Sequence, residues 1–249
     1  MTHRPIFTAS AIVGIVTLLT CIACDSSPVA YRPEPTVVTP NDVVDFKQLY
    51  GQNCAGCHGA DGKGGAAIAL ANPVFLAIAD DIVIRRIASN GVPGTPMPAF
   101  AQSAGGMLTE KQVDAIVSGI RSWAKPNAVG NQTPPPYTAQ VPGDPQHGAE
   151  AYRTYCSSCH GAGGRGGSEA SAIVDGSYLA LVSDQQLRTV VIAGRPELGA
   201  PDWRGDVEGR PMSEQDISDV VAWLSAHRPK FPGQPYPTAA ASPAQGGIQ

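Results

Sequence analysis

Two short motifs in this chain of 249 residues combine residue types that can bind a redox cofactor covalently. They read Cys54-Ala-Gly-Cys57-His58 and Cys156-Ser-Ser-Cys159-His160. The paired cysteines lie about one helical turn apart, so each sulfur can form a thioether with one vinyl group of a single haem. The histidine that follows then lies under the iron and supplies a neutral imidazole nitrogen. The motifs therefore predict two haem c groups, each with its iron bound by one of these histidines.

Two other interpretations of the pattern are weaker. A zinc site needs further Cys or His ligands at a suitable spacing, and none remain. A redox dithiol usually lies in a thioredoxin-like βαβ context, which this sequence lacks. The remaining cysteines, Cys21 and Cys24, lie in an apolar N-terminal stretch. Haem attachment is therefore the interpretation that fits both motifs.

The motifs belong to a tandem repeat. Residues 50–65 resemble residues 152–167, and the first cysteines of the motifs, Cys54 and Cys156, set an offset of 102 residues (156 − 54). The repeat continues through three further pairs: Phe75-Leu76 with Tyr178-Leu179, Arg85 with Arg188, and Trp123 with Trp223. One module has therefore been duplicated, and each copy carries its own cofactor motif.

The repeat predicts two domains, residues 42–126 and 144–229. Residues 127–143 contain Pro134-Pro135-Pro136 and no hydrophobic periodicity, which predicts an extended, semi-rigid linker. The tail, residues 230–249, is rich in Ala, Ser, Gly and Gln and is predicted to be disordered.

Each module is predicted to be helical, with long Gly- and Pro-rich loops. A first helix covers about residues 43–52 and 146–155. A middle helix begins near Asp80 or Ser183 and ends before Gly91 or Gly194, where glycine suits a C-cap. The last helix begins at a capping box, at residues 109–112 and 213–216. Its buried face is predicted to consist of Val113, Ile116, Val117 and Ile120, and of Ile217, Val220, Val221 and Leu224.

The N-terminus reads as an export signal. Residues 1–24 have a short basic start and then an apolar stretch that is too short to span a bilayer comfortably. Its end resembles a bacterial lipoprotein signal, with Ala23 before a cysteine, Cys24, that would be lipidated. The alternative is an uncleaved helix with two inert cysteines. Residues 25–41 are predicted to form a tether, and the chain is expected on the periplasmic side of a bacterial membrane.

Over Asp42–Lys125 and Gly143–Pro229 the sequence resembles the class I c-type cytochromes, in their tandem dihaem form. The resemblance implies an all-α fold of two small helical domains, each built around one haem. It further implies that the first and last helices cross beside the haem, that a methionine before the last helix is the sixth iron ligand, and that the function is electron transfer.

In the first module this resemblance points to Met97, within Pro96-Met97-Pro98. Met97 is then expected to face His58 across the iron. The alternative is that Met107 binds the iron and Met97 only packs. Met107 lies just before the Thr109 cap, where a packing role is the simpler expectation.

The second module departs from the family pattern, because Ala200 stands where the methionine is expected. Alanine cannot bind iron. Met212 is one candidate ligand, although it aligns with Leu108 and can equally pack at the helix entry. His227 and His147 are two further candidates, and a five-coordinate iron is the remaining alternative.

Further roles follow from the resemblance or stay open. The family pattern implies that the Pro73 carbonyl accepts the ring N–H of His58, whereas Gly176 stands at that place in the second module. Arg85 and Arg188 either reach haem propionates or are solvated helix charges.

The formal net charge of −4 gives no indication of nucleic-acid binding. We expect an electron-transfer protein rather than an enzyme, free or as a subunit of a larger complex. The partners expected are a quinol-oxidising complex or a terminal oxidase. The alternative is a dihaem peroxidase-like enzyme or a gas-binding protein that uses an open second haem.

Overall fold

The computed structural model describes residues 37–205, 207 and 209–230. The predicted signal peptide with Cys24, residues 25–36 of the predicted tether and residues 231–249 of the tail lie outside the described residues. Within the described ranges all regular secondary structure is helical, which confirms the all-α prediction. The β-type pairing in these ranges consists of isolated bridges. No helix in that part of the chain has the length and apolar character needed to cross a membrane.

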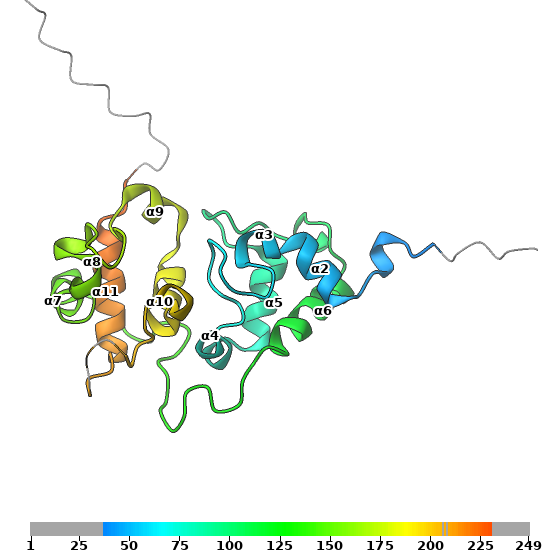
Figure 1. The fold of residues 1–249 in the computed structure, drawn as a ribbon. Coiled ribbons are helices and arrows are strands. Elements are labelled where there is room, and N and C mark those ends of the chain that lie inside the picture. The colour runs from blue at the N-terminus through cyan, green and yellow to red at the C-terminus, as the bar shows by residue number, and fades with distance from the viewer. Residues whose placement is uncertain (1–36, 206, 208, 231–249) are drawn as a thin grey trace, which may run out of the picture. The chain divides into compact units, whose positions relative to one another are not determined.

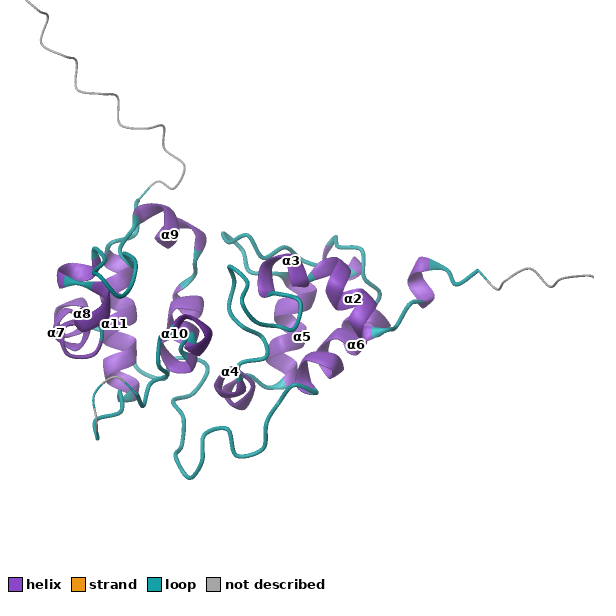
Figure 2. Cartoon of the chain, in the orientation of Figure 1, coloured by secondary structure: helices purple, strands orange, loops and turns teal. Residues whose placement is uncertain are grey.

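The α-helices follow one another in the same series in both repeats, whereas the short 3-10 helices (η) differ (Figure 1). The first contains η1 (Pro40–Asp42), α2 (Phe46–Asn53), α3 (Ala55–His58), α4 (Pro73–Ile78), α5 (Asp81–Asn90), η2 (Gln102–Ala104) and α6 (Glu110–Arg121). The second contains α7 (Pro145–Tyr155), α8 (Ser157–His160), η3 (Ala162–Gly164), α9 (Gly176–Leu181), α10 (Asp184–Ala193), η4 (Pro196–Leu198) and α11 (Glu214–Ala226). Figure 2 shows that long loops connect these short helices, as the glycine and proline content predicts.

The predicted helix ends are confirmed by the observed caps. Helix α5 has Asp80 as its N-cap and Gly91 as its C-cap, and α10 has Ser183 and Gly194 in the same places. Both last helices, α6 and α11, begin with a complete capping box. The side chain of the N-cap residue accepts from the backbone N–H three residues later, and the side chain of that later residue accepts from the N-cap backbone N–H. The apolar face predicted for these helices is buried at every position except Val221, which is partly buried.

Two short helices were not predicted, and local hydrogen bonds explain them. The side chain of Asn72 accepts from the backbone N–H of Val74 and of Phe75, which starts α4. In the second repeat Asp175 caps α9 in the same way. At six residues each, these helices are too short to show a clear period in the sequence.

The first and last helices of each module approach closely, and each repeat achieves this differently. In the first, Gly119 of α6 lies against the ring of Phe46 in α2. In the second, Gly148 of α7 lies against the backbone of Asp219 and the side chain of Trp223 in α11. By repeat alignment Phe46 corresponds to Gly148 and Gly119 corresponds to Trp223. The large and small partners have therefore exchanged helices.

The exchange explains why Trp123 and Trp223 align at an offset of 100 residues (223 − 123), whereas the first cysteines of the motifs align at 102. Trp123 packs on Tyr50 with ring centroids 5.0 Å apart, and Trp223 packs on Tyr152 at 4.4 Å. Counted from the capping boxes, however, Trp123 corresponds to His227, one helical turn beyond Trp223. The two indoles therefore pack on equivalent tyrosines from positions that lie one helical turn apart.

The linker contacts the second module. The Nε2 of Gln185 donates to the carbonyl of Tyr137 at 2.8 Å, and the Nε2 of Gln215 donates to that of Pro142 at 3.0 Å. At the start of the module, the backbone N–H of Asp144 donates to Asp219 at 2.6 Å. The linker contains no helix, and the carbonyls of Pro136, Tyr137 and Pro142 are instead satisfied by side chains of α10 and α11.

Candidate haem-attachment sites

The Cys-x-x-Cys-His motifs occupy matching turns between two helices. Cys54 ends α2 and is followed at once by α3, and the backbone N–H of His58 donates to the Cys54 carbonyl at 3.0 Å. The corresponding bond runs from His160 to Cys156, also at 3.0 Å. In each motif the first cysteine and the histidine are therefore joined by one helical turn, the arrangement expected for attachment to a single haem.

The cysteines of the motifs are partly buried except for Cys57, which is exposed. Cys54 is partly buried, and burial first, with the neighbouring Cys57 second, raises its pKa to about 11. Cys54 is consequently a neutral thiol at neutral pH. The hydroxyl of Tyr50, one turn earlier, donates to the carbonyl of Gly59 at 3.0 Å, and Tyr152 donates to Gly161 at 2.6 Å. These tyrosines fix the backbone immediately after each histidine.

Each motif histidine is oriented by a backbone carbonyl. The Nδ1 of His58 lies 2.8 Å from the carbonyl oxygen of Ile68, and the Nδ1 of His160 lies 2.8 Å from that of Ser171. Because a carbonyl only accepts, Nδ1 carries the proton and Nε2 keeps its lone pair. His58 is buried, and this burial lowers its pKa and favours the neutral ring, against the smaller opposite effect of the bond to Ile68. These residues fit a haem iron at Nε2.

The expected role of Pro73 is wrong. Pro73 is the first residue of α4, and its carbonyl does not pair with the ring of His58, which is held by Ile68 instead. The loop between the motif and α4 folds back toward the histidine earlier than the family pattern implies. Because Ser171 acts alike in the second repeat, the absence of proline at Gly176 has no consequence for the orientation of His160.

Met97 lies in a tight loop after α5. The backbone N–H of Val92 donates to the Met97 carbonyl at 3.0 Å, and the Met97 side chain is partly buried. The alternative ligand, Met107, is 79% exposed. The geometry therefore favours Met97 over Met107 as a residue that faces the interior of the module.

The backbone places Ala200 at the position of Met97. A Cβ at Gly91 would lie 2.5 Å from the carbonyl carbon of Pro98, and one at Gly194 would lie 2.6 Å from that of Pro201. The two prolines therefore correspond, and so do the residues before them. Ala200 is also held like Met97, because its carbonyl accepts from the backbone N–H of Arg195 at 3.0 Å.

Met212 occupies the position of Leu108 at the entry to the last helix. The backbone N–H of Met212 donates to the carbonyl of Trp203 at 2.8 Å, and that of Leu108 donates to Phe100 at 2.7 Å. Both side chains are buried. The connecting loop is one residue longer in the second module, which separates Met212 from Trp203 by nine positions instead of eight.

The two other histidines lie at helix ends. His147 is in the first turn of α7, with Nδ1 3.5 Å from a carboxylate oxygen of Asp144, and its side chain is 71% exposed. His227 caps α11, where Nδ1 lies 2.8 Å from the carbonyl oxygen of Trp223 and the ring packs on that indole. Both rings are therefore engaged with their own helix ends.

Arg85 and Arg188 have diverged in their surroundings. Arg85 forms an exposed ion pair with Asp114 between α5 and α6, as the solvated-charge alternative requires. Arg188, by contrast, is 2% exposed, and its guanidinium donates to the carbonyls of Pro136 and Tyr137 and pairs with Glu214. Both expectations for Arg188 are wrong, because the linker supplies the acceptors that the sequence does not reveal.

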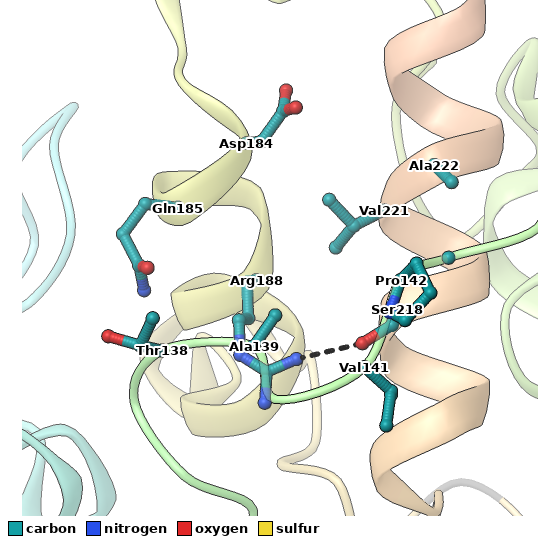
Figure 3. Close-up of a pocket in the computed structure, with 11 residues that line it drawn as sticks. Thr138, Ala139, Val141, Pro142, Asp184, Gln185, Arg188, Ser218, Val221 and Ala222 are labelled. Atoms are coloured by element: carbon teal, nitrogen blue, oxygen red, sulfur yellow. Dashed lines mark hydrogen bonds between the residues drawn. The ribbon is translucent and has the colours of Figure 1, made fainter.

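A pocket lies between the linker and the second module (Figure 3). Residues 138–143 form one wall and helices α10 and α11 form the other, with Arg188 donating to the hydroxyl of Ser218 at 3.4 Å. None of its lining residues belongs to a Cys-x-x-Cys-His motif. This pocket is therefore separate from the attachment sites.

An arginine near the end of each last helix binds two carbonyls of the same module, and this repeated contact was not predicted from the sequence. The guanidinium of Arg121 binds the carbonyls of Leu76 and Ala79, and Arg228 binds the corresponding carbonyls of Leu179 and Val182. Arg228 lies about one helical turn beyond the position equivalent to Arg121. Only the repeated targets, and not the alignment of the arginines, could have indicated this shared role.

Comparison with known proteins places the chain among cytochromes. A family model described as cytochrome c oxidase, cbb3-type, subunit III matches residues 41–118 and again residues 143–224. The proteins named "Cytochrome bc1 complex cytochrome c subunit" from Mycobacterium bovis and Mycobacterium tuberculosis are 24% identical over 221 residues, which cover 85% of this chain and 74% of theirs. The Mycobacterium leprae protein of that name is 26% identical over 183 residues, covering 72% of this chain and 59% of its own.

A solved chain from the Kuenenia stuttgartiensis reducing HAO-like protein complex Kustc0457/Kustc0458 is also similar, at 20% identity and a TM-score of 0.42. The match covers 78% of this chain and 99% of that one.

Proposed function

The chain belongs to the cytochrome c oxidase, cbb3-type, subunit III family, and we propose that it holds two haem c groups and passes electrons in a membrane-associated respiratory chain. The observation that carries this proposal is the repeated attachment geometry. In each module the histidine of a Cys-x-x-Cys-His turn has Nδ1 2.8 Å from a backbone carbonyl, which leaves Nε2 for iron. The haem iron, when bound, would carry one electron at a time.

The protein's own residues hold and orient the cofactors in this proposal. Haem 1 is attached by Cys54 and Cys57 with His58 as proximal ligand, and haem 2 by Cys156 and Cys159 with His160. The carbonyls of Ile68 and Ser171 accept from Nδ1, which leaves Nε2 for the iron, and they fix the plane of each ring. His58 is buried whereas His160 is only partly buried, so water has better access to the second site.

The relatives suggest where the electrons come from. They are named as cytochrome c subunits of a cytochrome bc1 complex, and we infer that this chain likewise accepts electrons from a quinol-oxidising complex and delivers them to a terminal oxidase. It would act on the periplasmic side of a bacterial membrane, anchored by a lipid on Cys24. Mass spectrometry of the purified chain tests the anchor, because a lipidated N-terminal Cys24 has a distinct mass and Cys24→Ala would lose it.

We propose different sixth ligands for the two irons. Met97 is the ligand at haem 1. At haem 2 Ala200 offers none, and Met212 is the methionine that we assign, because it is buried and its loop is one residue longer than in the first module.

The second candidate function rests on the same alanine. If Met212 keeps the packing role of Leu108, haem 2 has an open coordination position, and a small gas or peroxide could bind there. The protein would then be a gas-binding or peroxidase-like protein with one electron-transfer haem and one reactive haem.

Optical spectra with and without carbon monoxide separate these functions. A carrier with two methionine ligands shows the Met–iron charge-transfer band for both haems, and carbon monoxide leaves the reduced spectrum unchanged. Met97→Ala should remove that band from haem 1 and make it bind carbon monoxide. Met212→Leu should do the same at haem 2.

Ala200→Met is the matched gain-of-ligand variant. If haem 2 is open in the natural protein, carbon monoxide shifts its spectrum, Met212→Leu changes nothing, and Ala200→Met restores the charge-transfer band. A purified chain that carries no covalent haem at either motif would contradict the proposed function altogether.

A further inference from the structure

Arg195 lies in the loop that leads to the position of the missing methionine. It follows α10 and occupies the place of Val92 in the first module. Its backbone N–H donates to the carbonyl of Ala200 at 3.0 Å, and the N–H of Ala200 returns a bond to the Arg195 carbonyl at 3.1 Å. The backbone of Arg195 therefore braces the segment that carries Ala200.

The side chain of Arg195 reaches the first module. Its Nη2 donates to the carbonyl oxygen of Gly65 at 2.8 Å, and the side chain is only 14% exposed. Gly65 packs so closely on the attachment turn that a Cβ there would lie 2.1 Å from the carbonyl oxygen of Cys57. The guanidinium is thus bound to the loop that covers the first Cys-x-x-Cys-His motif.

A second hydrogen bond fixes the same approach. The Nδ2 of Asn72 donates to the carbonyl of Ala193 at 2.9 Å, and Asn72 is 4% exposed. Its Oδ1 is already used to cap α4. Ala193 ends α10, two residues before Arg195. The end of α10 and the residue Arg195 that follows it are therefore both hydrogen-bonded to the first module.

The contact carries charge. The Nε of Arg195 pairs with an oxygen of Glu197 at 2.5 Å, and the Glu197 side chain is 20% exposed. Because Gly65 packs on the carbonyl of Cys57, the residue before His58, the guanidinium places its charge beside the first site. A nearby positive charge favours the reduced iron, which carries one positive charge fewer, and a negative charge favours the oxidised iron.

We propose that Arg195 is a positioning residue that links the two haem sites: it holds the distal loop of haem 2 on the attachment loop of haem 1 and raises the reduction potential of haem 1. This proposal rests on the proposed function, since it requires haem at both motifs. In this proposal the reduction potential of haem 1, in the first module, depends on a residue of the second module.

Spectroelectrochemical titration of the full haem-loaded chain tests the link. Haem 1 is identified as the component whose potential moves in Met97→His. Arg195→Met removes the charge and the donor and leaves Glu197 unpaired, so the midpoint of haem 1 should fall. Arg195→Lys keeps the charge and should retain most of the potential, whereas Glu197→Gln should raise it.

Arg153→Met is the matched control. Arg153 is a 69% exposed arginine of the same module, with only a long ion pair to Glu150. Hydrogen exchange of residues 59–68 gives a readout independent of the potential, and it should quicken in Arg195→Met alone. Equal effects of Arg195→Met and Arg153→Met on both measurements would overturn the proposal. A wild-type chain without two haems would instead show, before any variant is compared, that the proposed function is wrong.

Discussion

Arg188→Met should destabilise the second module by about 3–5 kcal/mol, whereas Arg85→Met at the equivalent position should cost at most about 1 kcal/mol. The difference arises from burial. Arg188 is 2% exposed, and removing it leaves the carboxylate of Glu214 and the carbonyls of Pro136 and Tyr137 without their donor. The ion pair of Arg85 is exposed on both sides, so water replaces it readily.

Two measurements on the haem-loaded chain check this prediction. Urea unfolding followed by far-UV circular dichroism reports the stability, and hydrogen exchange of residues 137–144 reports whether the linker has left α10. Arg188→Met should lower the urea midpoint and quicken exchange in the linker, and Arg85→Met should do neither. If the two variants unfolded alike, the linker would not be part of the packed second module.

The sequence was sufficient for those parts of the fold that depend on local chemistry. The caps at Asp80, Ser183, Thr109 and Ser213 were predictable, because a side-chain acceptor at the right distance from an apolar helix determines where that helix begins. The motif turns were predictable for a similar reason: the cofactor chemistry requires a fixed spacing of Cys, Cys and His.

Contacts between distant segments were not predictable. Nothing near Arg188 in the sequence reveals that its acceptors are carbonyls 51 and 52 positions away. The carbonyls of Ile68 and Ser171 were missed because backbone acceptors leave no trace in residue type. Every residue has one, so only the loop path decides which carbonyl a histidine meets.

The repeat itself was visible, but the compensations within it were not. Equivalent contacts are made by residues at different positions: Arg121, at the end of α6, and Arg228, just beyond α11, bind equivalent carbonyls. Trp123 and Trp223 likewise meet equivalent tyrosines. A duplicated module can conserve a contact while moving the residue that makes it, because positions three or four apart on a helix share one face.

Gly148→Ala should strongly destabilise the second module. Its added Cβ would lie 2.0 Å from the carbonyl oxygen of Asp219 and 2.7 Å from the Cβ of Trp223. Since the first obstacle is backbone, α7 must move away from α11, and we expect a loss of about 3 kcal/mol or more. The movement also displaces Tyr152, whose hydroxyl fixes Gly161 directly after His160. Haem 2 should therefore show an altered spectrum as well as a lower urea midpoint.

Gly51→Ala is the matched control, because Gly51 lies within α2 and a Cβ there meets nothing within 4 Å. This substitution should stabilise the first module by about 0.5–1 kcal/mol through the better helix propensity of alanine. The exchange of partners between the modules predicts a further difference. The atoms nearest to a Cβ at Gly119 all belong to the ring of Phe46, a side chain that can rotate, so the cost of Gly119→Ala should lie below that of Gly148→Ala. If Gly119→Ala and Gly148→Ala lowered the stability equally, the backbone contact between α7 and α11 would be no harder to relieve than the contact with the Phe46 ring.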